Sequence, residues 1–236
     1  MPEPELQLFE PMSPAAFRPL DGVPGCCAVA RDEHFRVVWC NEEYARQLKT
    51  TPRRLQGQTI ADIMPAKKAE ERMSFMRPAL KGGTMVAYQQ FWVGHRWLTR
   101  VWPLDPEAFG LPGYFVVITK LSEPVGEPDS DDPVPIRFIY SPDLGDLEVL
   151  SPRELEVFYY LAAGMTVGDI AGAVHRSEKT IGRHVENIHK KMGYSSRAEL
   201  VRDAVQRGLI AYTDKQWLDL VDRKRGPESG KPPRKN

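Results

Sequence analysis

The sequence predicts two domains of different fold class, an α+β domain followed by an all-α domain. The length of 236 residues suits two domains of ordinary size. Short β-like runs flank a helical region between Gly25 and Leu121, and four helix starts with their own capping residues follow after residue 147. A hydrophobic fraction of 42% is enough to build a core for each domain.

The expected domain boundaries follow changes in composition along the chain. We expect a flexible leader over 1–24, the α+β domain over 25–121, an acidic linker over 122–146, the all-α domain over 147–212, and a short helix with a basic disordered tail over 213–236. The net charge of zero is unevenly distributed, because residues 122–148 hold one basic and eight acidic residues whereas 149–236 are net positive. This distribution permits a nucleic-acid partner but does not require one.

The elements of the α+β domain are predicted from strand and helix signals in order. Two short strands come first, Cys27–Ala30 and Phe35–Trp39. Four helical pieces follow: Glu42–Leu48, Arg53–Leu55, Ile60–Met64 and Ala66–Leu80. Three strands end the domain: Thr84–Val93, Arg96–Pro103 and Tyr114–Thr119. A tight turn at Gly94-His95 is expected between the first two of these, and the later segment Ile136–Tyr140 is read as a strand or a docking contact.

This order of elements resembles a PAS domain, in which a five-stranded antiparallel sheet and its helices enclose a pocket. The residues that carry the resemblance are Trp39-Cys40-Asn41 before a helix, Tyr44 within it, Leu55, Gly57, Ile63 and Pro65. The resemblance implies a sensory or interaction role, with a ligand that the sequence does not identify. No His lies within Met64–Gly83, where a haem-binding PAS domain carries its iron ligand, and the Asn-Cys-Arg-Phe signature of a flavin photosensor is absent. We therefore predict no cofactor.

The aromatic and cysteine residues of this domain each have two interpretations. Five aromatic residues lie on predicted strands: Trp39, Phe91, Trp92, Trp97 and Trp102. They can line a ligand pocket, but we favour a plain core or interface role. The pair Cys26-Cys27 can sense oxidants, but buried free thiols are the favoured interpretation. With Cys40 the cysteines number three, which fits a reducing compartment, and neither a signal peptide nor a membrane-length apolar stretch is visible. We expect a cytoplasmic protein with no membrane partner.

Four capped helix starts define the all-α domain. Ser151-Pro152-Arg153-Glu154 is a capping box with proline at the first helical position, and Ser196-Arg197-Ala198-Glu199 repeats the box at the fourth helix. Thr166 and Ser177 are the expected N-caps of the second and third helices. Only His175-Arg176 separates the short second helix from the third. A short helix, a brief turn and a longer helix form a helix-turn-helix unit.

The third helix, expected over 178–192, has two opposed faces. Its apolar ridge has helical spacing and is predicted to face the core: Ile181, Val185, Ile188 and Met192. A polar ridge with the same spacing lies opposite: Lys179, Arg183, Glu186 and Lys190. Arginine can pair with guanine, glutamate can accept a hydrogen bond from cytosine, and lysine can reach guanine or phosphate. Thr180 and Asn187 flank the ridge, and Thr166 and Ser177 mark helix N-termini suited to phosphate. These eight polar residues are the predicted DNA contacts.

The all-α domain resembles the LuxR-type DNA-binding domain. The residues that carry the resemblance are Leu150–Glu154, Leu161–Gly164, Asp169–Ala171, Ser177–Ile181, His184, Lys191–Gly193 and Arg197–Leu200. The resemblance implies a bacterial transcription regulator that binds double-stranded DNA, with 178–192 as the recognition helix in the major groove. It also implies a homodimer formed through the fourth helix, Glu199–Arg207, for which Val201 and Val205 are the candidate contacts.

Gly182 departs from this family pattern. The family commonly places Lys or Arg at this position for a DNA contact, and glycine costs a helix about 1 kcal/mol relative to alanine. One expected contact is therefore missing, and Arg183 would have to compensate for it.

Several alternative interpretations stay open. Glu186 can pair with Lys190 along the helix instead of reading a base, and His184 is expected to be a packed, hydrogen-bonded residue rather than a switch. The chain can be an adaptor that contacts RNA polymerase or another regulator, with Gly182 marking a weakened DNA face. It can also be an enzyme-like sensor with a bound redox cofactor. No catalytic or metal-binding spacing is present, so we predict neither an enzyme nor a metal site.

Two hypotheses connect the domains. In the first, the PAS-like domain receives a signal and alters how two recognition helices meet half-sites one helical turn apart. In the second, the acidic linker competes with phosphate for the basic surface. Neutralising Asp129, Asp131 and Asp132 would then tighten DNA binding at low salt, and unchanged affinity would discard the idea.

Overall fold

The computed structural model describes residues 19–21, 23–121, 136–139 and 141–224, which form two compact units. Of these residues, the first unit comprises 19–21, 23–88, 98–119 and 136–137, and the second comprises 89–97, 120–121, 138–139 and 141–224. The segment 89–97 thus belongs to the second unit, although it lies within the predicted α+β domain. The leader up to residue 18, the three aspartates of the linker hypothesis and the tail from 225 lie outside the described residues. The domain boundaries stay predictions.

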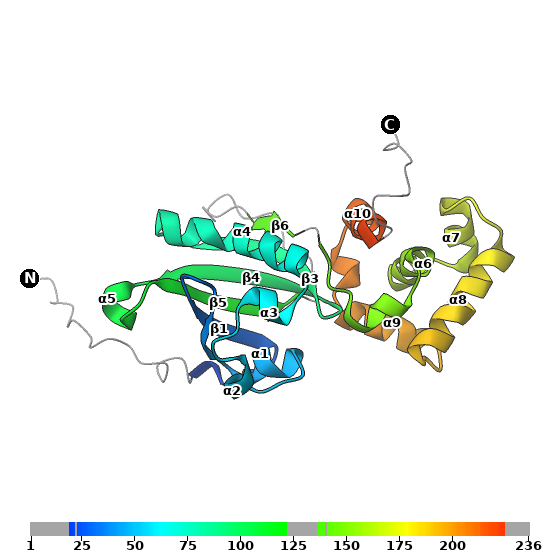
Figure 1. The fold of residues 1–236 in the computed structure, drawn as a ribbon. Helices are drawn as coiled ribbons and strands as arrows, with labels where there is room; N and C mark the ends of the chain where they lie inside the picture. Colours follow the sequence, from blue (N-terminus) through cyan, green and yellow to red (C-terminus); the bar gives the residue numbers. More distant parts are fainter. Residues whose placement is uncertain (1–18, 22, 122–135, 140, 225–236) are drawn as a thin grey trace, which may run out of the picture. The chain divides into compact units, whose positions relative to one another are not determined.

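The strands form a sheet with the order β2-β1-β5-β4-β3-β6 (Figure 1). They are β1 (Cys26–Asp32), β2 (Val37–Cys40), β3 (Val86–Trp92), β4 (His95–Leu104), β5 (Gly113–Lys120) and β6 (Ile136–Phe138). Strand β1 is antiparallel to both of its neighbours, with Val29 opposite Cys40 in β2 and Val116 in β5. The predicted fold class, a PAS-like α+β sheet with helices, is confirmed. The segment that was left open as a strand or a docking contact is β6.

The turn between β3 and β4 lies one residue earlier than predicted. It is formed by Val93 and Gly94, with φ of 49° and 72°, while His95 already belongs to β4. Two successive positive φ values are the signature of a type I′ hairpin turn, which matches the twist of the flanking strands. A β-branched residue at positive φ is strained, so the valine is held there by its surroundings.

The helices of the first unit are α1 (Glu42–Gln47), α2 (Pro52–Leu55), α3 (Ile60–Ile63), α4 (Ala66–Gly82) and α5 (Pro106–Phe109). Asn41 explains why α1 begins where it does. Its buried side chain accepts hydrogen bonds from the backbone N–H groups of Ala28 and Tyr44, each at 3.0 Å, and so fixes α1 to β1. Helix α5 was missed from the sequence, although Asp105 caps it and proline occupies its first turn.

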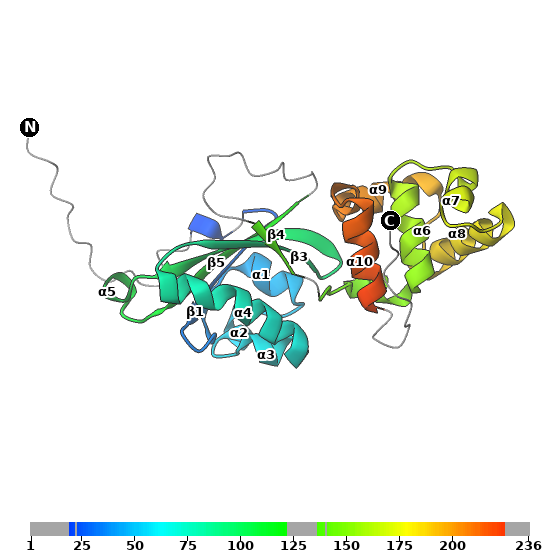
Figure 2. The ribbon, with the colours of Figure 1, turned by 90° about the horizontal axis from the view of Figure 1, so that it is seen from above.

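The second unit contains the all-α domain that the sequence predicts. Its elements are η2 (Gly145–Val149), α6 (Pro152–Ala162), α7 (Val167–Ala173), α8 (Glu178–Met192), α9 (Arg197–Gln206), η3 (Leu209–Ala211) and α10 (Asp214–Lys224). Helix α10 lies beside α6 (Figure 2), and its Trp217 is fully buried in their shared core, where Nε1 donates to Leu155 O at 3.1 Å. The expected late helix carrying this tryptophan is therefore present. None of the helices in the described ranges has the length and apolar character needed to cross a membrane.

Candidate nucleic-acid interface

Helix α8 is capped at both ends by the residues that the sequence indicates. Ser177 is the N-cap, and its Oγ accepts a hydrogen bond from the Thr180 N–H at 3.2 Å. Gly193 is the C-cap in the left-handed conformation, with φ of 75°, and its N–H donates to His189 O at 2.8 Å. These local interactions determine the length of the helix.

The two ridges of α8 have the predicted orientation. Ile181 and Ile188 are 0% exposed, and Val185 and Met192 are half-buried against the same core. The opposite ridge is exposed at every position: Lys179, Arg183, Glu186 and Lys190. The helix therefore presents a continuous charged edge of the kind that enters a major groove.

Within α8, the ion pair that the structure shows does not involve the charged edge. Lys191 Nζ contacts Glu154 Oε2 at 2.7 Å, and the same oxygen accepts from the Ser151 N–H at 2.7 Å. Burial disfavours the charged carboxylate, but these hydrogen bonds outweigh it and hold the pKa of Glu154 below its ordinary value. The pair fixes α8 against α6. Glu186 and Lys190, although correctly spaced, do not form the ion pair that was the alternative interpretation.

The flanking polar residues are less uniform than the central ridge. Thr180 and Asn187 are half-buried, whereas Thr166 and Ser177 are exposed. The Thr166 hydroxyl is engaged in a capping box, because it donates to Asp169 Oδ2 at 2.6 Å and accepts from the Asp169 N–H at 3.1 Å. Hydrogen bonds from this threonine lower the pKa of Asp169. The first turn of α7 therefore carries a fixed negative charge, which disfavours phosphate there.

Two residues of α8 behave differently from the pattern around them. His184 is half-buried, as expected for a packed residue. Its Nδ1 has no hydrogen-bond partner among the described residues, so the predicted hydrogen bond is absent at this atom. A Cβ built at Gly182 would meet nothing within 4 Å. Steric crowding in the chain itself therefore does not explain why this position lacks the basic side chain.

The candidate dimer residues lie on α9. Val201 is half-buried and packs in part against the core of its own unit, while Val205 is half-buried outside that core. Their role in self-association stays a prediction.

The first unit contains a cavity whose lining residues form no recognisable catalytic group. A cavity of about 360 Å³ is lined by residues of β2, α2 and their surroundings: Asp21, Val37, Val38, Trp39, Cys40, Glu42, Pro52, Arg53 and Gln56. Burial raises the pKa of the Cys40 thiol to about 11 and also raises that of Cys26, so neither is an activated thiolate. No cluster of potential metal ligands occurs among the residues that the structure describes.

The aromatic residues of the sheet divide between the two units. Trp39 and Trp102 are half-buried in the first unit, whereas Phe91 and Trp97 are fully buried in the second. Trp97 Nε1 donates to Trp92 O at 2.7 Å. The favoured interpretation as core holds for Phe91, Trp92 and Trp97.

Comparison with known protein families assigns both regions. The model of the luxR family of bacterial regulatory proteins matches residues 148–204, and a model of the PAS fold matches residues 20–126. The chain carries a LuxR-type helix-turn-helix domain and a PAS domain. The LuxR family is one of regulators, not of enzymes.

Curated relatives match the chain over short stretches. The chain is 36% identical over 62 residues to a probable transcriptional regulatory protein NarL of Mycobacterium tuberculosis, covering 26% of this chain and 29% of the relative. It is 38% identical over 63 residues to the response regulator VraR of Staphylococcus aureus, covering 27% and 30%. The chain thus spans less than a third of the length of these relatives.

Among solved structures, a complex of VqmA of Vibrio cholerae with ligand and DNA is similar over 88% of this chain and 93% of its own, at 20% identity and a TM-score of 0.45. A domain of an HTR-like protein from Haloarcula marismortui covers 41% of this chain at 18% identity and a TM-score of 0.38.

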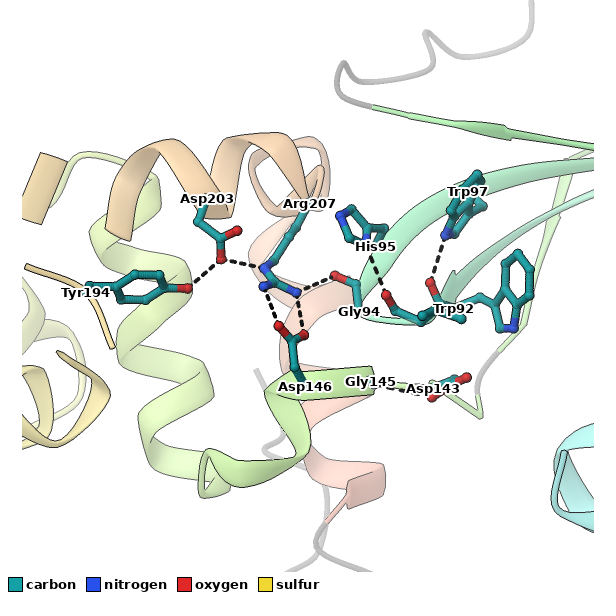
Figure 3. A network of polar contacts seen from close by, with 11 residues as sticks. Trp92, Gly94, His95, Trp97, Asp143, Gly145, Asp146, Tyr194, Asp203 and Arg207 are labelled. Carbon is teal, nitrogen blue, oxygen red and sulfur yellow. Dashed lines mark hydrogen bonds and ion pairs between the residues drawn. The ribbon is translucent and has the colours of Figure 1, made fainter. Parts of the chain in front are cut away.

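Sequence reasoning missed the contribution of β3 and β4 to the second unit. Their hairpin contacts Arg207, which follows the last residue of α9, over a separation of 113 residues (Figure 3). No periodicity or capping signal reports such a contact. The sequence shows only an arginine at the end of the helix with Asp203 four residues before it, and this spacing indicates a pair within the helix rather than a contact with the hairpin.

Proposed function

We propose that the chain is a DNA-binding transcription regulator that presents α8 to the major groove and acts as a homodimer through α9. The observation that carries this proposal is the opposition of the two faces of α8 within a LuxR-type domain. Ile181 and Ile188 are completely buried, whereas Lys179, Arg183, Glu186 and Lys190 are exposed and not fixed by neighbouring charges. Helices with this division can dock on their own domain and read base edges at the same time.

Each residue of the charged edge has a proposed role. Arg183 pairs with guanine, Glu186 accepts from cytosine, and Lys179 and Lys190 contact phosphate or guanine. Thr180, Asn187, Ser177 and Thr166 lie at the flanks, where side chains contact the backbone. Of these flanking residues, we expect Thr166 to contribute least, because its hydroxyl is bonded to the negatively charged Asp169, which disfavours phosphate there.

The PAS domain is proposed to modulate this binding in the cytoplasm in response to a signal. The cavity beside β2 gives a small molecule or a peptide side chain a place to bind. Support comes from the presence of both domains in one chain.

The experiment that tests DNA binding starts from the full chain. Duplexes that it retains are selected from a random pool, and their affinity is then measured by electrophoretic shift for Arg183→Ala and for Lys215→Ala. Lys215 is an exposed lysine of α10 in the same unit and serves as the control. The Arg183 variant should lose about 1–3 kcal/mol of binding and relax specificity at one base pair, while the control should bind like the wild type.

The same experiment tests the adaptor alternative, in which the domain contacts RNA polymerase or another regulator. An adaptor would select no duplex sequence, and Arg183→Ala would cost it no DNA affinity.

A further inference from the structure

The tip of the β3–β4 hairpin is built into the second unit around the end of α9. The N–H of Arg96 donates to Arg207 O at 2.8 Å, and Arg207 Nη1 donates to Gly94 O at 3.2 Å. The N–H of Gly94 in turn donates to Asp143 O at 3.1 Å. Figure 3 shows the hairpin carbonyl and the guanidinium pointing toward one another. Backbone and side-chain hydrogen bonds thus tie the tip to α9 and to the segment before η2.

Arg207 lies at the centre of this contact. Its side chain is buried and pairs with both oxygens of Asp146 at 2.7 and 2.8 Å, while Nε donates to Asp203 Oδ2 at 2.5 Å. Asp203 also accepts from the Tyr194 hydroxyl. Although burial alone would lower the pKa of Arg207, the hydrogen bonds that it donates to its carboxylate partners raise it. A bidentate arginine–carboxylate pair fixes the relative orientation of the two side chains as well as their distance.

Apolar packing adds to these polar contacts. Phe91 of β3 is 0% exposed, and its ring lies 5.7 Å from Trp217 and 6.1 Å from Tyr212. The buried guanidinium of Arg96 lies 4.7 Å from the Tyr212 ring centre and donates to Ala211 O at 2.6 Å. The tip therefore completes the core that α6, η3 and α10 begin.

Two glycines show how closely the segments approach. A Cβ at Gly94 would lie 2.8 Å from Arg207 Nη1 and 3.0 Å from Asp146 Oδ1. A Cβ at Gly208, directly after Arg207, would lie 2.1 Å from the backbone oxygen of Leu121. Both glycines have positive φ, of 72° and 75°. The contact leaves no room for even a methyl group and is therefore specific in register.

We propose that this hairpin tip is a clamp on the last turn of α9 and that the clamp controls self-association of the chain through α9. Strands β3 and β4 each begin or end in the first unit and run into the tip. The inference rests on the proposed function, because the role of α9 in the dimer is part of that proposal. When the tip is bound to Arg207, it holds in place the face of α9 that carries Val201 and Val205. When the tip is released, that face loses this support.

The test places a methyl group in the clamp without removing any charge. Gly94→Ala does this, and Gly110→Ala is its matched control, because Gly110 has φ of 73° but nothing within 4 Å of a Cβ. Amide hydrogen exchange of the full chain without DNA should become at least about tenfold faster over 89–97 and 203–212 in Gly94→Ala and stay unchanged in Gly110→Ala. Sedimentation equilibrium should show self-association weakened by about tenfold in the same variant.

Asp146→Asn is the second variant, because its side chain is 62% exposed and the substitution keeps the shape while removing one charge of the pair. It should shift both measurements in the same direction as Gly94→Ala, by a smaller factor. Unchanged exchange in both variants would overturn the clamp. Faster exchange with unchanged self-association, or a wild-type chain that stays monomeric, would overturn its control of the dimer.

The DNA-binding proposal fails separately. Arg183 is exposed and makes none of the contacts of the hairpin tip described above, so Arg183→Ala should leave exchange and self-association unchanged whatever it does to DNA binding.

Discussion

The charged edge of α8 and the cluster around Arg207 use the same residue types in opposite ways. On α8, Lys179, Arg183 and Lys190 are exposed, and the pair that anchors the helix is made by Lys191 instead. Arg207 is buried and pairs with Asp146 and Asp203. Cations whose donors stay available can bind a ligand, whereas cations whose donors are all engaged hold parts of the chain together. The difference separates the proposed recognition surface of α8 from a structural cluster that holds the second unit together.

The largest effect that would separate these two regions is on stability. Arg207→Ala should lower the free energy of unfolding of the second unit by about 3 kcal/mol, because it removes a buried side chain and leaves the Gly94 carbonyl, Asp146 and the half-buried Asp203 without this donor. Amide hydrogen exchange of α6 to α10 at increasing urea concentrations measures this. Arg202→Ala, at an exposed arginine of the same helix, is the control and should cost less than about 0.5 kcal/mol. An equal loss of unfolding free energy in both variants would show that the cluster around Arg207 does not hold the second unit together.

A smaller effect is expected for a cation of the recognition surface. Lys179→Ala should leave stability unchanged but weaken DNA binding for all sequences alike, and lower the slope of log affinity against log salt by about 1. Titrations of the selected duplex at several salt concentrations measure that slope. Lys215→Ala should leave it unchanged. If the two lysine variants behaved alike, the charged edge of α8 would not be the DNA surface.

Gly182 allows the recognition surface to be strengthened. Because a side chain there meets open space, Gly182→Ala should stabilise α8 by up to about 1 kcal/mol through helix propensity alone. Gly182→Lys should add a few-fold gain in DNA affinity to a similar stabilisation. Thermal unfolding and DNA titration of the two variants separate the contributions. Equal DNA affinity in both would mean that position 182 does not face the duplex.

The smallest effect concerns acid pH. Hydrogen bonds from Arg207 lower the pKa of Asp146 below its ordinary value of 3.8. A carboxyl with a lowered folded-state pKa stabilises the fold above its unfolded pKa, and this stabilisation is lost as the pH falls through the folded pKa. Wild type should therefore lose slightly more stability than Asp146→Asn between about pH 5 and pH 2. Tryptophan fluorescence follows the acid unfolding of both proteins. An equal loss of stability in the two would contradict this account.

The sequence predicted those parts of the molecule whose signals are local. Ser151, Thr166, Ser177 and Ser196 each cap the helix that they were expected to cap, and the spacing of Ile181 and Ile188 gave the inward face of α8. Capping and periodicity depend on residues only three or four positions apart, so a single sequence contains them.

The parts that the sequence did not predict depend on contacts between distant residues. Phe91 appeared as a strand residue of the α+β domain, but it packs against Trp217 in the second unit. Arg207 appeared as the end of a dimer helix, but it binds the hairpin tip. Strand periodicity indicates which residues are buried and not which element covers them. The turn was displaced by one residue because Val93 adopts a positive φ, which its residue type disfavours.

The central claim, that α8 reads base edges through Arg183, is tested most directly by changing one acceptor on the DNA. In the selected duplex, each guanine is replaced in turn by 7-deazaguanine, which lacks the N7 acceptor, and affinity is measured for the wild type and for Arg183→Ala. One replacement should weaken the wild type by about tenfold and have no further effect on Arg183→Ala, because the partner of that acceptor is already gone. Equal weakening of both proteins at every guanine would contradict the account.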